Sequence, residues 1–77
     1  MTETFLQYDV VRIKALPLSS QVPNQFDLRI PRIGDIATII EIYTKPVGYE
    51  LECSDQDGIT QWMMAFAPGE AEFEHVD

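Results

Sequence analysis

The stretch "RIGDIATIIEIY", Arg32–Tyr43, places a Gly-Asp turn directly before a strand that is apolar on almost every residue. Gly34 and Asp35 favour the turn, because glycine tolerates positive φ and the aspartate side chain hydrogen-bonds nearby backbone. The residues 36–44 that follow are rich in β-branched side chains, which favour a strand. A strand with one wet face alternates apolar and polar residues, so this run predicts that both of its faces are covered.

The faces of this central strand can be assigned from Glu41, which should face water. Strict alternation then puts Ala37, Ile39 and Tyr43 on the same outer face as Glu41. The core-facing set is Ile36, Thr38, Ile40 and Ile42.

Two other strands alternate more cleanly. The segment 9–16, "DVVRIKAL", is expected to point Val11 and Ile13 into the core. The segment 49–54, "YELECS", alternates three apolar residues with three polar ones, and is the clearest half-buried strand in the chain. Its core-facing residues are Tyr49, Leu51 and Cys53.

The strand "ITQWMMAF", 59–66, follows a tight hairpin turn at "DQDG" and is apolar on both faces. We place Ile59, Gln61, Met63 and Ala65 inside. The opposite, outer set contains Thr60, Trp62, Met64 and Phe66.

The remaining segments complete an all-β pattern. Three prolines between 17 and 31 predict a long ordered first loop, and "APGEAEFEHVD" predicts one helical turn over 68–72 followed by a short strand over 73–76. Five short strands with these connections predict a small SH3-like partly open barrel, since a sandwich needs about seven strands. The 77 residues form a single domain, of which residues 1–8 are expected to be flexible or loosely packed.

Charge is distributed unevenly along the chain, which has a net charge of −8. The part up to Lys45 has five acidic and five basic residues, whereas the rest has eight acidic residues and no base. This field repels a phosphate backbone and favours a basic protein partner. No membrane-spanning run or secretory leader is visible, so we expect a cytoplasmic protein.

Catalytic and metal-binding signatures are weak. His75 has no nucleophile placed beside it by a known motif, and Cys53 is expected to be a buried, unreactive thiol because its neighbours are acidic. "SDQDG" lacks the ligand spacing of a calcium loop and is better explained as a hairpin turn. We therefore predict no enzyme activity, no cofactor and no metal site.

The motifs "YDVVRIK", "GDIATIIEIY" and "YELE" resemble an uncharacterised family of short bacterial proteins, often cyanobacterial. The resemblance covers most of 8–66 and implies an SH3-like fold without an assigned activity. Ala37 departs from the glycine usual in that family, and the loop 17–31 is longer than the family pattern.

The assigned faces leave several large apolar side chains on the outside of the barrel, and something must cover them. One explanation is that the proline-rich loop and the N-terminal "TFLQY" fold over them. The other is a contact patch for a protein partner or a second copy of the chain. The candidate contact residues are Ile39, Tyr43, Trp62, Met64 and Phe66.

Two functional hypotheses follow. The first is a non-enzymatic, acidic protein-interaction module, either an accessory subunit or an antitoxin-like or immunity-like neutraliser of a basic partner. The alternative is a nucleic-acid or ribosome-associated module, for which four cations would have to converge on one side of the barrel. These cations are Arg12, Lys14, Arg29 and Arg32.

Overall fold

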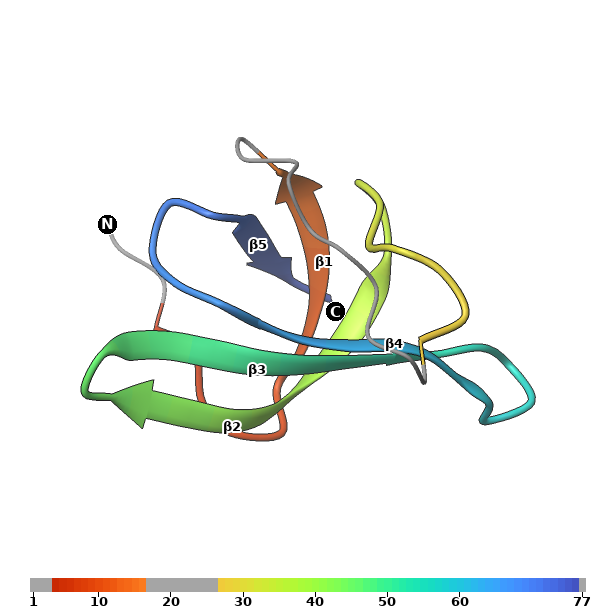
Figure 1. Ribbon diagram of the computed structural model, residues 1–77, viewed down its shortest axis with the longest axis horizontal. Helices are drawn as coiled ribbons and strands as arrows, with labels where there is room; N and C mark the ends of the chain where they lie inside the picture. The colour runs from red at the N-terminus through yellow and green to blue at the C-terminus, as the bar shows by residue number, and fades with distance from the viewer. Residues whose placement is uncertain (1–3, 17–26, 77) are drawn as a thin grey trace.

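Five antiparallel strands form one sheet in this computed structural model, which describes residues 4–16 and 27–76 (Figure 1). The strands are β1 (Val10–Ala15), β2 (Ile36–Thr44), β3 (Val47–Ser54), β4 (Thr60–Phe66) and β5 (Glu72–His75). Their order in the sheet is β4-β3-β2-β1-β5, so the first strand pairs with the last. The predicted SH3-like, partly open barrel fits this arrangement, with the opening between β4 and β5.

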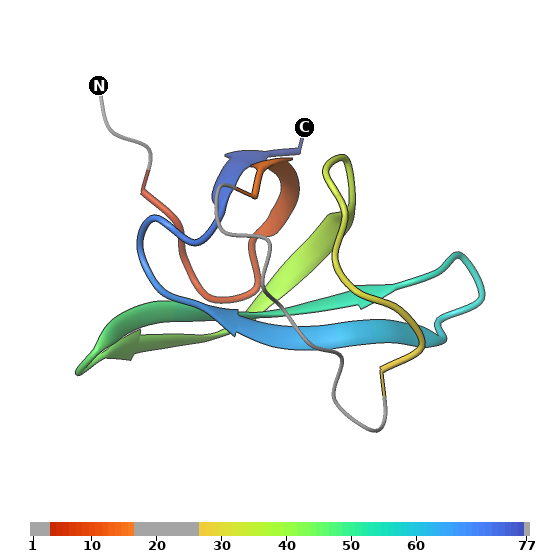
Figure 2. The same cartoon turned by 45° about the horizontal axis from the view of Figure 1, so that its top comes forward.

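The sheet curls into a partly open barrel because β2 pairs with strands of both halves. The beginning of β2 pairs with β1 and its remainder pairs with β3. Figure 2 shows β3 and β4 in one layer with β1 and β5 above it, while β2 bends from one layer to the other. The pairing of β2 with β3 shifts by one residue between Ile39 and Glu41, and such bulges bend a strand.

This bulge overturns the predicted faces of the first half of β2. Ala37 and Ile39 are buried, whereas Ile36 is exposed. An extra residue in one strand reverses the inward and outward alternation beyond it, so counting back from Glu41 by twos gave the wrong face. After the bulge the prediction is confirmed, since Glu41 is exposed and Ile42 packs against the core.

The predicted faces of β4 are also wrong. Cys53 of β3 pairs with Trp62, and Tyr49 pairs with Phe66. Directly paired residues share a face, so these partners of inward-facing β3 residues must point inward as well. Trp62 and Phe66 are fully buried, while Met63 is exposed.

The core consists of side chains from the first four strands, and the predicted inward residues of β1 and β3 are confirmed there. Its fully buried members are Val11, Ile13, Ala37, Ile39, Leu51, Cys53, Trp62 and Phe66.

The predicted helical turn over 68–72 is absent. The segment is a reverse turn in which the amide of Glu70 donates to the carbonyl of Ala67 at 3.1 Å. Pro68 and Gly69 occupy the two central positions, and Gly69 has φ of +88°. Proline followed by a glycine of positive φ defines a type II turn and cannot continue a right-handed helix.

Part of the first loop borders the outer edge of β4. The amide of Leu28 donates to the carbonyl of Gln61 at 2.8 Å, and a carboxylate oxygen of Asp27 accepts from the amide of Met63 at 3.2 Å. Leu28 and Ile30 are exposed, so these two side chains do not cover the barrel. Residues 17–26, to which the prediction of a covering loop mainly referred, lie outside the described residues.

Candidate functional site: an acidic face and an aromatic pocket

The five predicted contact residues do not form an outer patch. Ile39, Trp62 and Phe66 are fully buried, and Met64 is half-buried against the core. Only Tyr43 is exposed, with 41% of its surface accessible. The expected outer position is therefore wrong for the three buried residues, because of the bulge in β2 and the register of β4.

The carboxylate of Asp35 organises one end of the core. Nη1 and Nη2 of Arg29 donate to its two oxygens at 2.8 and 3.0 Å, which is a bidentate pair. Nε1 of Trp62 and the amide of Arg32 donate to Oδ2 at 3.0 and 2.9 Å. A buried indole needs such an acceptor, and the Gly-Asp turn supplies it. We call these four residues the Asp35 cluster.

The Asp35 cluster is ionised at neutral pH. Burial alone would raise the pKa of Asp35, but the hydrogen bonds from Arg29, the Arg32 amide and Trp62 outweigh it and lower the pKa below its ordinary value. The hydrogen bond to Asp35 raises the pKa of Arg29 in turn. Arg29 thus has a structural partner inside the fold, with 26% of its side chain accessible.

Cys53 adjoins the Asp35 cluster. Its Sγ lies 3.8 Å from Nη2 of Arg29, and burial raises the pKa of the thiol. A protonated, buried thiol is a poor nucleophile. Within the described ranges, no group of three or more His, Cys, Asp or Glu side chains is arranged to hold a metal ion.

The four cations of the nucleic-acid hypothesis have different surroundings. Arg29 is bound to Asp35, and Nη1 of Arg12 lies 3.5 Å from Oε1 of Glu74. Lys14 is exposed at the edge of a pocket described below, and Arg32 is exposed next to the Gly-Asp turn. Two of the four guanidinium and ammonium groups are therefore already paired with carboxylates.

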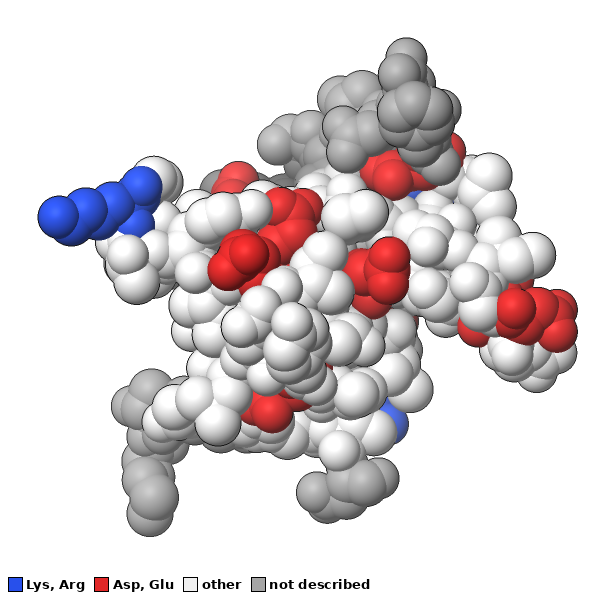
Figure 3. Space-filling model, turned by 90° about the horizontal axis from the view of Figure 1, so that it is seen from below, with Lys and Arg blue, Asp and Glu red and all other residues white. Residues whose placement is uncertain are grey.

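Acidic side chains gather on the outer side of β2 and β3. Glu41 lies directly opposite Glu50, and Glu52 is the next outward residue of β3. None of the three forms a salt bridge with another described residue. In Figure 3, which views the molecule from below, acidic groups are spread over the visible surface and basic groups lie near its edges. We call the outer side of β2 and β3 the acidic face.

Exposed apolar groups border the acidic face. Tyr43 donates its hydroxyl hydrogen to Oε1 of Glu50 at 2.8 Å, and this hydrogen bond raises the pKa of the phenol. Met63 lies opposite Glu52 and is 38% accessible, and Ile36 is exposed at the start of β2. The surface therefore combines negative charge with apolar area, as protein interfaces often do.

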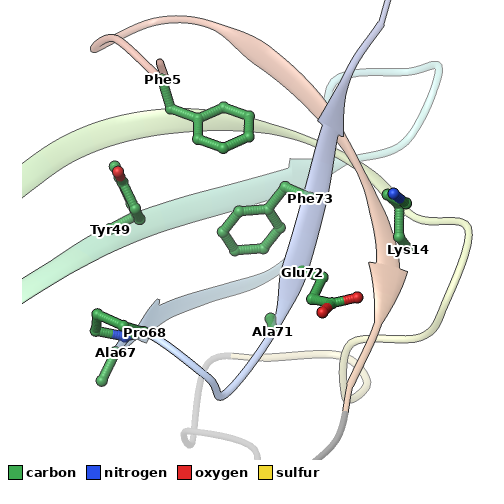
Figure 4. Close-up of a pocket in the computed structure, with 8 residues that line it drawn as sticks. All are labelled: Phe5, Lys14, Tyr49, Ala67, Pro68, Ala71, Glu72 and Phe73. Atoms are coloured by element: carbon green, nitrogen blue, oxygen red, sulfur yellow. The ribbon is translucent and has the colours of Figure 1, made fainter. Parts of the chain in front are cut away.

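A second feature is a pocket of about 460 Å³ at the opposite end of the core (Figure 4). Three aromatic rings line it: Phe5 before β1, Tyr49 from β3 and Phe73 from β5. Each pair of rings is nearly perpendicular, with interplanar angles of 77° to 87° and centroids 6.0 to 6.2 Å apart. The rest of the lining comes from Lys14, Ala67, Pro68, Ala71 and Glu72. We call this the aromatic pocket.

Phe5 is held in the aromatic pocket by contacts that sequence reasoning did not identify. Its ring lies 4.7 Å from that of His75, whose Nε2 is 3.1 Å from Oδ2 of Asp9. Asp9 also accepts from the amide of Leu6, and the amide of Tyr8 donates to the carbonyl of Ile39 at 2.6 Å. Only the apolar "TFLQY" before the first strand pointed to such packing.

Comparison with known proteins assigns no relatives. No protein-family model, curated protein or solved structure matches the chain. The described part of the chain also contains no helix with the length and hydropathy needed to cross a membrane.

Proposed function

We propose that this protein is a non-enzymatic interaction module whose acidic face binds a basic surface of a protein partner. The observation that carries the proposal is the position of Glu41 directly opposite Glu50, with Glu52 beside them and no described cation paired with any of the three. An accessory subunit and an antitoxin-like or immunity-like neutraliser are both roles of this kind.

Like charges placed opposite each other across two strands destabilise a sheet. Lysine or arginine side chains of a partner would remove that repulsion and form charge-assisted hydrogen bonds with the carboxylates. Tyr43 and Met63 add exposed apolar area beside the charges. The net charge of −8 would speed association with a basic surface and make the association rate depend on salt.

The nucleic-acid alternative gains no support from the geometry of the four cations. Arg29 and Arg12 are engaged with Asp35 and Glu74, and freeing them would break existing ion pairs. Phosphate recognition also requires the release of counterions by a cationic surface, and the acidic face has the opposite sign.

The test is affinity purification with three immobilised baits, read by quantitative mass spectrometry. The baits are the wild type, a variant with Glu41→Gln, Glu50→Gln and Glu52→Gln, and a single-charge control, Asp57→Asn. Asp57 is an exposed acid in the β3–β4 turn, away from the acidic face. We expect a basic protein to bind the wild type and the control, and to be depleted at least tenfold on the triple variant.

Binding of the purified partner should then weaken as salt increases. Equal recovery of the partner on all three baits would contradict the assignment of the acidic face. Micromolar RNA or DNA binding at physiological salt would favour the alternative function.

A further inference from the structure

We propose that the aromatic pocket is a second contact site, which receives an aromatic side chain of a partner protein. The site is separate from the acidic face, because none of Glu41, Glu50 and Glu52 lines it. Its walls instead belong to the N-terminal segment, β1, β3, β5 and the type II turn before β5.

The walls favour an aromatic occupant. Phe5, Tyr49 and Phe73 already pack with one another in edge-to-face pairs, and a fourth ring can extend this arrangement. Edge-to-face pairs add about 0.5–1.5 kcal/mol beyond the burial of apolar area. Figure 4 shows the rings of Phe5 and Phe73 directed toward the middle of the pocket, with Tyr49 on one side.

The polar end of the pocket favours a neutral occupant that has both a donor and an acceptor. Lys14 and Glu72 line this end together, and they lie away from Phe5 and Tyr49 in Figure 4. Neither residue is in a salt bridge with another described residue. The ammonium group can donate to a peptide carbonyl, and the carboxylate can accept from a peptide N–H. Their charges balance, so a charged side chain gains little from them.

Size is consistent with this occupant. A pocket of about 460 Å³ is at the lower end of the roughly 300–1,000 Å³ of small-molecule sites, and it can hold one large side chain with its peptide groups. Aromatic anchors that fill such pockets usually dominate the energy of protein interfaces. The occupant is therefore an aromatic residue in an exposed loop or terminus of a partner.

Small blocked amino acids test the chemistry of the pocket without knowledge of the partner. N-acetyl-tryptophanamide, N-acetyl-leucinamide and N-acetyl-lysinamide are titrated into the whole protein, and NMR shifts of the Phe5, Tyr49 and Phe73 rings are followed. We expect saturable shifts with the tryptophan probe, with a Kd of about 1 mM, as suits a fragment. The leucine and lysine probes should bind at least fivefold more weakly.

Variants show whether the probe occupies the pocket. Ala71→Met, which adds a side chain at the pocket wall, should weaken the tryptophan probe at least fivefold. The matched control Ala65→Met adds the same group on the outer side of β4, outside this pocket, and should leave the affinity unchanged. Lys14→Met and Glu72→Gln should each weaken binding about two- to fivefold while the spectrum keeps its dispersion.

Several outcomes would overturn the inference. Unsaturable or absent shifts of the three rings would mean that they form a closed structural cluster. Equal binding of the leucine probe would remove the aromatic preference, and tighter binding of the lysine probe would contradict a neutral occupant. None of these results depends on the acidic face, so failure here would leave the proposed function intact.

Discussion

The two ends of the aromatic row inside the barrel differ in how their polar groups are used. Trp62, Phe66 and Phe73 follow one another with ring centroids about 6 Å apart. At the Trp62 end, Asp35 accepts from the indole, a guanidinium and a backbone amide. At the Phe73 end, the rings meet a pocket whose charged side chains, Lys14 and Glu72, are exposed.

If the aromatic pocket binds a partner as we propose, this difference separates the groups that stabilise the domain from those that bind. The part-buried carboxylate of Asp35, with its donors in place, links the Gly-Asp turn, the first loop and β4 to one another. The same arrangement would be a poor binding site, because its polar groups are already satisfied. The Phe73 end, which we call the open end, keeps apolar area and polar groups accessible. It therefore buries less surface and stabilises the fold less.

The largest expected loss of stability is at the Trp62 end of the aromatic row, which we call the closed end because its polar groups are already paired. Asp35→Ala removes the acceptor of the Trp62 indole N–H and the carboxylate partner of Arg29, whose guanidinium keeps the Ile30 carbonyl. The ion pair is part-buried, and several hydrogen bonds to a charged group are lost with it, so we expect a cost of about 2–4 kcal/mol of unfolding free energy. Urea denaturation followed by tryptophan fluorescence measures the loss. A loss of unfolding free energy below about 1 kcal/mol would show that the Asp35 cluster does not stabilise the closed end more than the open end is stabilised.

The pH dependence of stability tests whether the ionised carboxylate of Asp35 stabilises this end of the core. The folded-state pKa of Asp35 is lowered, so its contribution is present above its unfolded value near 3.8 and is lost as pH falls through the folded pKa. We expect the stability difference between wild type and Asp35→Asn to be constant from pH 5 to 7 and to shrink below pH 3.8. A difference unchanged at pH 2.5 would contradict an ionised Asp35.

Trp62→Phe removes one donor of the Asp35 cluster. An aromatic ring and most of the packing are kept, but the indole hydrogen bond to Asp35 is lost, and the smaller phenyl ring leaves some space in the core. We expect a loss of about 1–3 kcal/mol in a thermal or urea melt. If the variant were as stable as wild type, the hydrogen bond between Trp62 and Asp35 would contribute nothing to the free energy of unfolding.

Phe5→Ala tests the open end and should have the smallest effect on stability. Phe5 is half-buried, so loss of its contacts with Tyr49, Phe73 and His75 should cost about 1–2 kcal/mol. The variant should also fail to bind N-acetyl-tryptophanamide. Its melting curve is compared with that of Leu6→Ala, since Leu6 is an exposed neighbour outside the pocket. A loss as large as that of Asp35→Ala would mean that the open end is part of the stabilising core.

Strand predictions succeeded where only one face of a strand is apolar. The alternation of "YELECS" leaves a single reasonable register, and Leu51 and Cys53 are buried as predicted. In β4 both faces carry apolar side chains, so alternation alone could not decide between them. The pairing of Cys53 with Trp62 decided the question, and it is a contact between strands.

Some missed features had a local signal. "APG" followed by an acidic residue is a turn pattern with proline and glycine in the two central positions, and the expected helical turn conflicted with it. The partner of Arg29 had no such signal. Arg29 and Asp35 are six residues apart across a reverse turn, and Trp62 reaches them from a distant strand.

The sequence by itself determined the all-β class, the order of the five strands along the chain, the faces of β1 and β3, and the excess of negative charge after Lys45. These properties depend on local conformational preference, on a two-residue period and on composition. The tertiary structure decided the faces of β4, the reversal within β2, the acceptor for Trp62 and the pocket formed by Phe5. Each of those depends on which segments meet across the barrel, because a bulge, a cross-strand partner or a buried hydrogen bond joins residues that are not neighbours in the sequence.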